Sequence, residues 1–374
     1  SLLVGQSPFL IDSTLTSTIP QSISNSIQIG DINNDGYNDI IYSGYDSTRF
    51  GLFVDVLTGN NEGTLSINYQ TNFPTYPDTI AEYLGGLGNI SLVDVNLDGY
   101  IDMYVNGSAK SKLLMNVSGN SFSESSMIHN MSVTYSHGKW SDVNMDGKPD
   151  LFLMGVNEYS DNILNELFIN LGTDLDEDPS TIFPSLFTGS NSWGDYDNDG
   201  DPDLIILGQT ADPNSSVSRL YQNDPIGRLT EVTTASAIKG LKAGASHFVD
   251  LDSDGDLDFV CSYGARSFTI WDSNGDLVWD SGDQISHLVA ANNEWINGYT
   301  GSRNDGKGAE PEGITVGQAY GSTYAFVGLE RAGGIMIFDI SNPNAPVFSQ
   351  YVYLPDHVSP EGLAFVSGAD SPNG

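Results

Sequence analysis

A nine-residue acidic pattern, D-x-[DN]-x-D-G-x-x-D, occurs five times in the chain. The copies begin at Asp31, Asp94, Asp142, Asp195 and Asp250. Successive copies are therefore separated by 63, 48, 53 and 55 residues. Self-similarity at a period of about 50 residues is the signature of a repeated supersecondary unit. The spacing predicts that the chain is built from copies of one structural element.

The same kinds of residue flank each copy of the pattern. An apolar run follows each last aspartate, for example LIILG after Asp203, and two more strand-like stretches usually come after it. Short runs rich in β-branched and aromatic residues favour strands, and four strands per repeat are typical of a β-propeller blade. A large apolar residue stands two positions before each first aspartate: Ile29, Leu92, Trp140, Trp193 and Phe248.

We therefore expect an all-β fold, a β-propeller of four-stranded antiparallel blades, with seven blades in all. Five blades contain the acidic loops, and a sixth spans about residues 312 to 354. The seventh is a composite of N-terminal strands and the strand EGLAFV at 361–366, which would remove the exposed edges of an open ring. This prediction makes residues 1–374 a single domain with closing strands at 1–19, acidic repeats at 20–265 and further blades at 266–374.

Each acidic loop has the composition of a calcium site. Residues one, three and five of a tight loop can converge on one point, and the glycine at six permits the turn. The backbone carbonyl at seven then points inward, and the aspartate at nine closes the shell. All these donors are oxygen atoms, which suit Ca²⁺ better than Mg²⁺. Position twelve lies in a strand and lacks the glutamate of an EF-hand, so the loops are expected to join strands.

We expect about five bound Ca²⁺ ions, one per loop, with ligands at the same five positions. In the first three loops the ligands are Asp31, Asn33, Asp35, Tyr37 and Asp39; Asp94, Asn96, Asp98, Tyr100 and Asp102; and Asp142, Asn144, Asp146, Lys148 and Asp150. In the last two loops they are Asp195, Asp197, Asp199, Asp201 and Asp203; and Asp250, Asp252, Asp254, Asp256 and Asp258. Position seven contributes its backbone carbonyl. Because an aspartate replaces asparagine at position three, the last two loops are expected to bind Ca²⁺ more tightly.

The net charge of the chain is −36, from 13 basic and 49 acidic residues. This balance argues against binding to nucleic acid or to anionic membrane surfaces, both of which require clustered Lys and Arg. No apolar run approaches the length of a membrane helix, so no direct membrane insertion is expected. Loops of this kind bind calcium at about 10⁻⁴ to 10⁻³ M, a level found outside cells. The expected location is extracellular or at the cell surface.

The five loops resemble the FG-GAP/VCBS repeats of integrin-α-type β-propellers over about residues 20–265. The segments SRNDGKGAEPEGITVG and ERAGGIMIFDISNP, within about residues 265–374, resemble choice-of-anchor I proteins, which are bacterial secreted or surface propellers. These resemblances imply calcium loops on one face of a propeller, between the first two strands of each blade. They also imply roles in adhesion, ligand binding or surface assembly. The ligand-binding signatures of integrins are not clear here, so no ligand-binding residues are carried over.

No catalytic set is predicted from the sequence. The five histidines lack metal-ligand spacing, and Cys261 lies in an apolar strand, where a cysteine usually packs as a small hydrophobe. The strongest candidate for another site is a long polar loop at about 283–311 together with Glu312 and Glu361. These glutamates either bind a metal or cationic ligand at the propeller mouth, or form turns and ion pairs.

Three functions are compatible with these features. The first is an extracellular, calcium-stabilised propeller that binds a protein or glycan ligand in adhesion or surface assembly. The second is a secreted metal-dependent hydrolase of the phosphoesterase kind, which needs a metal with an open coordination position. The third is a structural subunit of a surface filament or larger assembly. The first accounts best for the placement of the acids, so we expect a binding module rather than an enzyme.

Overall fold

The computed structural model forms six four-stranded antiparallel sheets and the short helix α3 in the part of the chain that it describes. The described residues are 9, 23–46, 51–60, 66–67, 89–106, 111–119, 121–128, 131, 133–157, 162–186, 188–212, 214–233, 244–252, 255–262, 266–291, 308–353 and 363–367. No helix among them is long and apolar enough to cross a membrane.

Each sheet contains four consecutive strands. The first two sheets are β1 (Ile23–Gly30), β2 (Asp39–Asp46), β3 (Gly51–Thr58) and β4 (Ser66–Ile67), and β5 (Asn89–Val93), β6 (Asp102–Asn106), β7 (Lys112–Val117) and β8 (Ser121–Glu124). The next two are β9 (Thr134–Ser141), β10 (Asp150–Asn157), β11 (Asn162–Asn170) and β12 (Leu175–Glu177), and β13 (Thr188–Gly194), β14 (Asp203–Gln209), β15 (Ser216–Gln222) and β16 (Thr230–Glu231). The last two are β17 (Ser246–Val249), β18 (Asp258–Ser262), β19 (Phe268–Trp271) and β20 (Leu277–Asp280), and β21 (Pro311–Ala319), β22 (Ser322–Leu329), β23 (Ile335–Asp339) and β24 (Val347–Val352).

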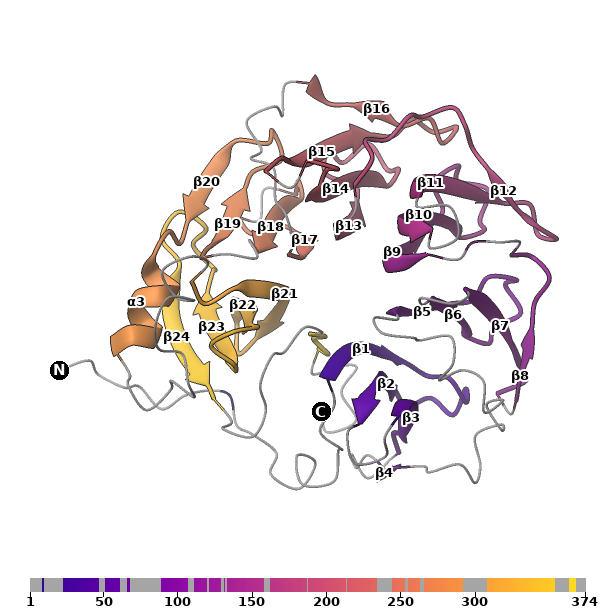
Figure 1. Ribbon diagram of the computed structural model, residues 1–374, viewed down its shortest axis with the longest axis horizontal. Coiled ribbons are helices and arrows are strands. Elements are labelled where there is room, and N and C mark those ends of the chain that lie inside the picture. The colour runs from indigo at the N-terminus through magenta and orange to yellow at the C-terminus, as the bar shows by residue number, and fades with distance from the viewer. Residues whose placement is uncertain are drawn as a thin grey trace.

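The six sheets surround a common centre, with β1, β5, β9, β13, β17 and β21 as the innermost strands (Figure 1). In every sheet the spatial order of the strands is their order along the chain. Consecutive innermost strands contact each other from β1 through β21. This arrangement is a β-propeller and confirms the predicted fold class.

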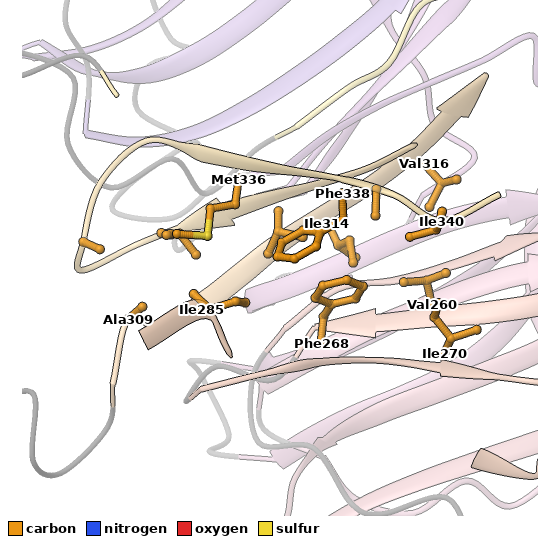
Figure 2. Packing of buried hydrophobic residues seen from close by; sticks show 14 of the residues in the cluster. Val260, Phe268, Ile270, Ile285, Ala309, Ile314, Val316, Met336, Phe338 and Ile340 are labelled. Carbon is orange, nitrogen blue, oxygen red and sulfur yellow. The ribbon is translucent and has the colours of Figure 1, made fainter. Parts of the chain in front are cut away.

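The hydrophobic core lies between adjacent blades. The second strand of each blade is buried on both faces, and this explains why a continuous apolar run follows each acidic loop: all five residues of β18 are buried, for example. Figure 2 shows the packing between the fifth and sixth blades, where the rings of Phe268 and Phe338 lie 5.0 Å apart and Val260 and Ile270 face the sixth blade. Blades therefore stabilise one another by burying their shared faces.

The predicted count of seven blades is wrong for the described residues, which form six. Residues 363–366, the described part of the expected closing strand at 361–366, are not in a strand. The ring of Phe365 instead stacks on Phe326 at 5.6 Å, in space left by the missing side chain of Gly317. Phe9 also contacts Phe326, at 5.2 Å, so segments from both ends of the chain pack on the sixth blade. The other residues of the proposed N-terminal strands lie outside the described residues.

Helix α3 (Gln284–Ala291) occupies the start of the segment that the sequence suggested to be a loop at 283–311. Ile285 and Val289 are both fully buried and belong to the core between the fifth and sixth blades. Their spacing of four residues places them on one face of the helix. Residues 292–307 lie outside the described residues.

Asparagine side chains tie three blades to the acidic loop of the blade before. Asn170, at the end of β11, donates to the carbonyl oxygen of Val95 in the preceding loop at 2.9 Å and to that of Pro149 in its own blade at 3.1 Å. Both carbonyls therefore depend on one buried amide. The equivalent donors are Asn116, which bonds to Ile32, and Asn223, which bonds to Val143.

We predict that Asn170→Ala lowers the free energy of unfolding by about 1–3 kcal/mol, because it leaves two carbonyl oxygens without this donor. Urea denaturation at a fixed calcium concentration measures the change. Asn344→Ala, at an exposed turn residue, is the matched control and should change stability little. If both substitutions changed the free energy of unfolding equally, the stabilising role of the Asn170 hydrogen bonds would be contradicted.

Candidate metal centre

The five acidic loops join the first strand to the second strand of the first five blades. This confirms the prediction that they connect strands rather than helices. The loops occupy residues 31–38, 94–101, 142–149, 195–202 and 250–257. Asp254, an expected ligand in the fifth loop, lies outside the described residues.

Backbone N–H groups hold the acidic side chains of the loop inward. Asp31, at position one, accepts from the N–H of Asp35 at 3.0 Å and from that of Gly36 at 2.7 Å. Asn33 accepts from the same Asp35 N–H at 3.0 Å, and Asp35 accepts from the N–H of Tyr37 at 3.0 Å. The contacts of position one and position five recur in the second, third and fourth loops. Side chains at positions one, three and five therefore surround the loop interior.

The glycine at position six is required by the backbone and not by crowding. Its φ lies between +88° and +100° in all five loops, a conformation that L side chains rarely adopt. A Cβ atom added at Gly36, Gly99, Gly147 or Gly200 would meet nothing within 4 Å. The sequence pattern therefore requires glycine here because the turn demands this φ.

The aspartate at position nine is the buried anchor of each loop. Asp150 is fully buried, and its two oxygens accept from the N–H of Val143 at 3.0 Å and from that of Asn170 at 2.7 Å. It therefore fixes both the start of its own loop and the end of the third strand. The other members of the set are Asp39, Asp102, Asp203 and Asp258.

Burial raises the pKa of these anchors, and the backbone donors lower it in part. The pKa is raised to about 6 for Asp39, Asp102 and Asp150, and to about 7 for Asp203. Charge repulsion from the neighbouring loop aspartates raises the pKa of these anchors further. A cation in the loop would oppose both effects, because it favours the charged carboxylate.

Three of the expected ligands of the fourth loop converge. Ligand oxygens of Asp195, Asp197 and Asp203 lie within 4.8 Å of one another. Asp201, at position seven, is only 1% exposed, and neither carboxylate oxygen has a hydrogen-bond partner among the described residues. Burial, followed by the charge of Asp199, raises the pKa of Asp201 to about 6. The sequence prediction used only the backbone carbonyl of Asp201. An aspartate at position seven, where the first three loops have Tyr or Lys, could have indicated that the side chain also takes part.

The third loop differs because its position seven is a lysine. The Lys148 ammonium lies 2.7 Å from Oδ2 of Asp146, and it lowers the pKa of that carboxyl. One expected ligand oxygen is thus already paired with a cation from the chain itself. Loops three and four therefore differ by two charges at position seven alone.

The fifth loop lies against the fourth. The Asn198 side chain donates to the carbonyl oxygen of Gly255 at 2.5 Å. The buried Asp258 accepts from the N–H of Leu251 at 3.0 Å, as its equivalents do in the other loops. Asp250, Asp252 and Asp256 are half-buried or exposed residues of the same loop.

A second acidic group lies at the edge of the sixth blade. Carboxylate oxygens of Glu310, Glu312 and Glu330 lie within 4.8 Å of one another, and Arg331 forms an ion pair with Glu310. Burial and then the charge of Glu310 raise the pKa of Glu330. The sequence prediction grouped Glu312 with Glu361, which lies outside the described residues. The ion pair with Arg331 involves Glu310, so the two alternatives stated for Glu312 and Glu361 remain predictions.

Cys261 is fully buried in β18, and burial raises its pKa to about 12. Burial thus disfavours the reactive thiolate, and the side chain packs in the core as predicted.

The donor set of the acidic loops suits a hard divalent cation. Every candidate donor is an oxygen atom, and in the fourth loop three carboxylates converge while a fourth is buried without a hydrogen-bond partner among the described residues. Positions one, three, five and nine, with the carbonyl of position seven, would hold the ion. The cation would supply charge neutralisation to a turn that otherwise gathers like charges.

These features define a β-propeller with acidic strand-to-strand loops. The sequence matches the FG-GAP-like repeat over residues 142–206 and the Choice-of-anchor I domain over residues 198–343. Together with the β-propeller fold, these two partial matches support both resemblances, although each spans less than half of the chain. The choice-of-anchor match begins inside the fourth loop, well before residue 265. A propeller of this composition fits a surface or adhesion-type module. No curated protein matches the chain.

Solved structures agree with the fold. A lectin from Agrocybe aegerita that recognises non-reducing terminal N-acetylglucosamine is 14% identical, with a TM-score of 0.53, over 88% of this chain and 80% of the lectin. The V. cholerae biofilm matrix protein Bap1 is 14% identical, with a TM-score of 0.41, over 70% of this chain and 39% of Bap1. At 14% identity the likeness to the lectin concerns the fold alone, and the TM-score of Bap1 is too low to support a structural comparison.

We predict that Lys148→Gln increases the calcium affinity of the third loop by up to about tenfold, because it frees an oxygen of Asp146 and removes a competing charge. Calorimetric titration of calcium into the wild type and the variant measures the weakest class of sites. Lys112→Gln, which removes a lysine outside the loops, should leave the titration unchanged. An unchanged weak class in Lys148→Gln would contradict the prediction.

The raised anchor pKa values predict an unusual pH dependence. The folded state of the calcium-free protein binds protons more tightly than the unfolded chain, so its stability should fall as pH rises from about 4 to about 7. Calcium competes with these protons, so its apparent affinity should rise over the same range. Urea denaturation in chelator and in excess calcium measures both effects. A calcium-free stability that rises with pH over this range would contradict the assignment.

Proposed function

We propose that the protein is an extracellular or cell-surface propeller that binds about five Ca²⁺ ions and presents a protein- or glycan-binding surface in adhesion or surface assembly. The observation that carries this proposal is the recurrence of one acidic turn between the first two strands of five successive blades. In this proposal the ions are structural, and the first four would hold loops that the next blade also contacts.

Electrostatics supports a cation in these turns. The fourth loop contains five aspartates in nine positions and no basic residue. Carboxylates a few ångströms apart repel each other strongly when they are partly buried. The nearby Gln222 donates to Asp197 but adds no positive charge. A divalent ion offsets this repulsion and explains why the cluster can lie beside a buried strand.

The contacts between loops and neighbouring blades support a structural role for the ions. A Cβ at Gly119, in the second blade, would lie 2.6 Å from the carbonyl oxygen of Asn33 in the first loop. A Cβ at Gly227, in the fourth blade, would lie 3.0 Å from the Asn144 side chain in the third loop. Position three of the first and third loops thus lies against the next blade. An ion that orders the loop also orders this contact.

The choice-of-anchor I match supports a surface or secreted location. Sites of this kind, with dissociation constants of about 10⁻⁴ to 10⁻³ M, would be filled at extracellular calcium levels. The high negative charge favours a ligand that is neutral or basic at the contact. A protein or glycan surface meets this condition better than a nucleic acid does.

We predict that chelation of calcium lowers the thermal midpoint of unfolding, and that adding back calcium restores it by binding only the folded state. The double variant Asp195→Asn with Asp197→Asn should be less stable in calcium and should respond less to the ion. Asp176→Asn, which removes an exposed acid outside the loops, is the charge control. Scanning calorimetry measures the midpoints.

An unmoved midpoint in chelator would contradict structural calcium. The binding role is tested separately by applying the calcium-loaded protein to immobilised glycans and surface proteins. Non-reducing terminal N-acetylglucosamine is a suitable first sugar, because a lectin with the same fold recognises it. Failure to bind any glycan or protein surface would contradict the adhesion role while leaving the calcium sites intact.

A further inference from the structure

An aromatic contact between the second and third blades provides a reference geometry. Ser91 on β5 lies directly across from Tyr104 on β6, so the two side chains share one face of the second blade. Trp140 on β9 packs edge-on against the Tyr104 ring at 5.9 Å. Its indole N–H donates to the Ser91 hydroxyl at 3.0 Å. The indole N–H of Trp140 thus finds its hydrogen-bond acceptor in the preceding blade.

The same geometry recurs one blade further on, with a lysine in place of the serine. Lys139 on β9 lies directly across from Phe152 on β10, and Trp193 on β13 packs edge-on against Phe152 at 6.3 Å. Both pairs hold the same positions relative to the acidic loops: three and two residues before the first aspartate. By analogy with the Trp140–Ser91 pair, we expect the Trp193 indole N–H to lie beside Lys139. A lysine ammonium has three donors and no acceptor, so it cannot replace the serine hydroxyl.

Neither of these donors has an acceptor in the part of the chain that the structure describes. The Trp193 Nε1 atom is buried and has no hydrogen-bond partner there. Lys139 likewise has neither a hydrogen bond nor a salt bridge to the described residues. An unsatisfied buried N–H costs about 1–3 kcal/mol, and most buried donors have a partner. The buried Trp193 N–H therefore lacks an acceptor among these residues, whereas the exposed Lys139 ammonium is open to water or to an anion.

One other basic side chain, that of His247, lies near enough to Lys139 to be affected by its charge. Protein atoms around the side chain lower the pKa of Lys139, yet solvent still reaches it. His247 on β17 also has a lowered pKa, first because of burial and second because of the charge of Lys139. β9, β13 and β17 are consecutive innermost strands (Figure 1). Two basic side chains therefore influence each other at the centre of the ring.

We propose that Lys139 and Trp193 form an anion site between β9 and β13, at the centre of the propeller, that binds a carboxylate group. A carboxylate has two acceptor oxygens and a single charge, so one oxygen can accept from the ammonium and the other from the indole N–H. A phosphate dianion would meet stronger repulsion from a chain of net charge −36. Because the Lys139 side chain is exposed to solvent, a carboxylate group can reach it. This site is independent of the calcium loops.

The carboxylate can belong to a small free acid or to an acidic sugar, and the test separates these sources. Five indole N–H signals, one per tryptophan, are expected in a nitrogen-15 NMR spectrum, and Trp193→Phe identifies the Trp193 signal by its loss. Calcium-loaded protein is titrated with sodium acetate and, separately, with sodium glucuronate. Sodium chloride at matched ionic strength is the blank. Both acids should shift the Trp193 signal, and glucuronate should bind more tightly if the ligand is a sugar.

Lys139→Met should weaken carboxylate binding by about tenfold or more, because it removes a charge-assisted hydrogen bond. Lys112→Met, which removes a lysine paired with Glu124 on another blade, should leave the affinity unchanged. The thermal midpoint of each variant confirms that it is folded. A Trp193 signal that moves no more with acetate or glucuronate than with chloride overturns the proposal. So does equal carboxylate affinity in the wild type and a folded Lys139→Met.

Discussion

A buried aspartate that accepts two backbone N–H bonds is the interaction on which each blade depends. Asp150 shows the arrangement: one oxygen bonds to the start of the acidic loop and the other to the end of β11. The carboxylate thereby fixes three strands relative to one another from a single buried point. Its burial would be costly without these donors, because a charge in the interior must be hydrogen-bonded or neutralised. The acidic loop above it brings further negative charge close to this anchor, and a cation bound in the loop would resolve that conflict.

The same residues connect blade structure to the metal site and to the next blade. Asn170 gives its backbone N–H to Asp150 and its side-chain amide to the preceding loop. The acidic loop therefore presents its carbonyl to a neighbour that is itself held by a buried carboxylate. Core packing between blades, as between Phe268 and Phe338, supplies the apolar part of the same interface. The polar and apolar contacts act together because they share one boundary.

Much of the fold could be predicted from the sequence, since the motif repeats with constant flanks. The glycine at position six and the buried run after position nine specify a turn and a strand directly. The closing blade could not be predicted in this way, because Phe365 packs on the face of β22 and does not pair at an edge. Helix α3 was missed because its buried face consists of only two residues, Ile285 and Val289. At the metal site, the pattern identified the loops but did not reveal that Asp201 is buried or that Lys148 pairs with Asp146.

The asparagine tethers also give the ring a direction. Each one runs from the third strand of a blade back to the loop of the blade before it, and the described residues contain three in succession, at Asn116, Asn170 and Asn223. Damage to one loop is thus transmitted first to the blade that follows it along the chain. A protein assembled in this way resists local fraying at its middle blades more than at the first, whose third strand is followed by Gly59 and therefore lacks such an amide.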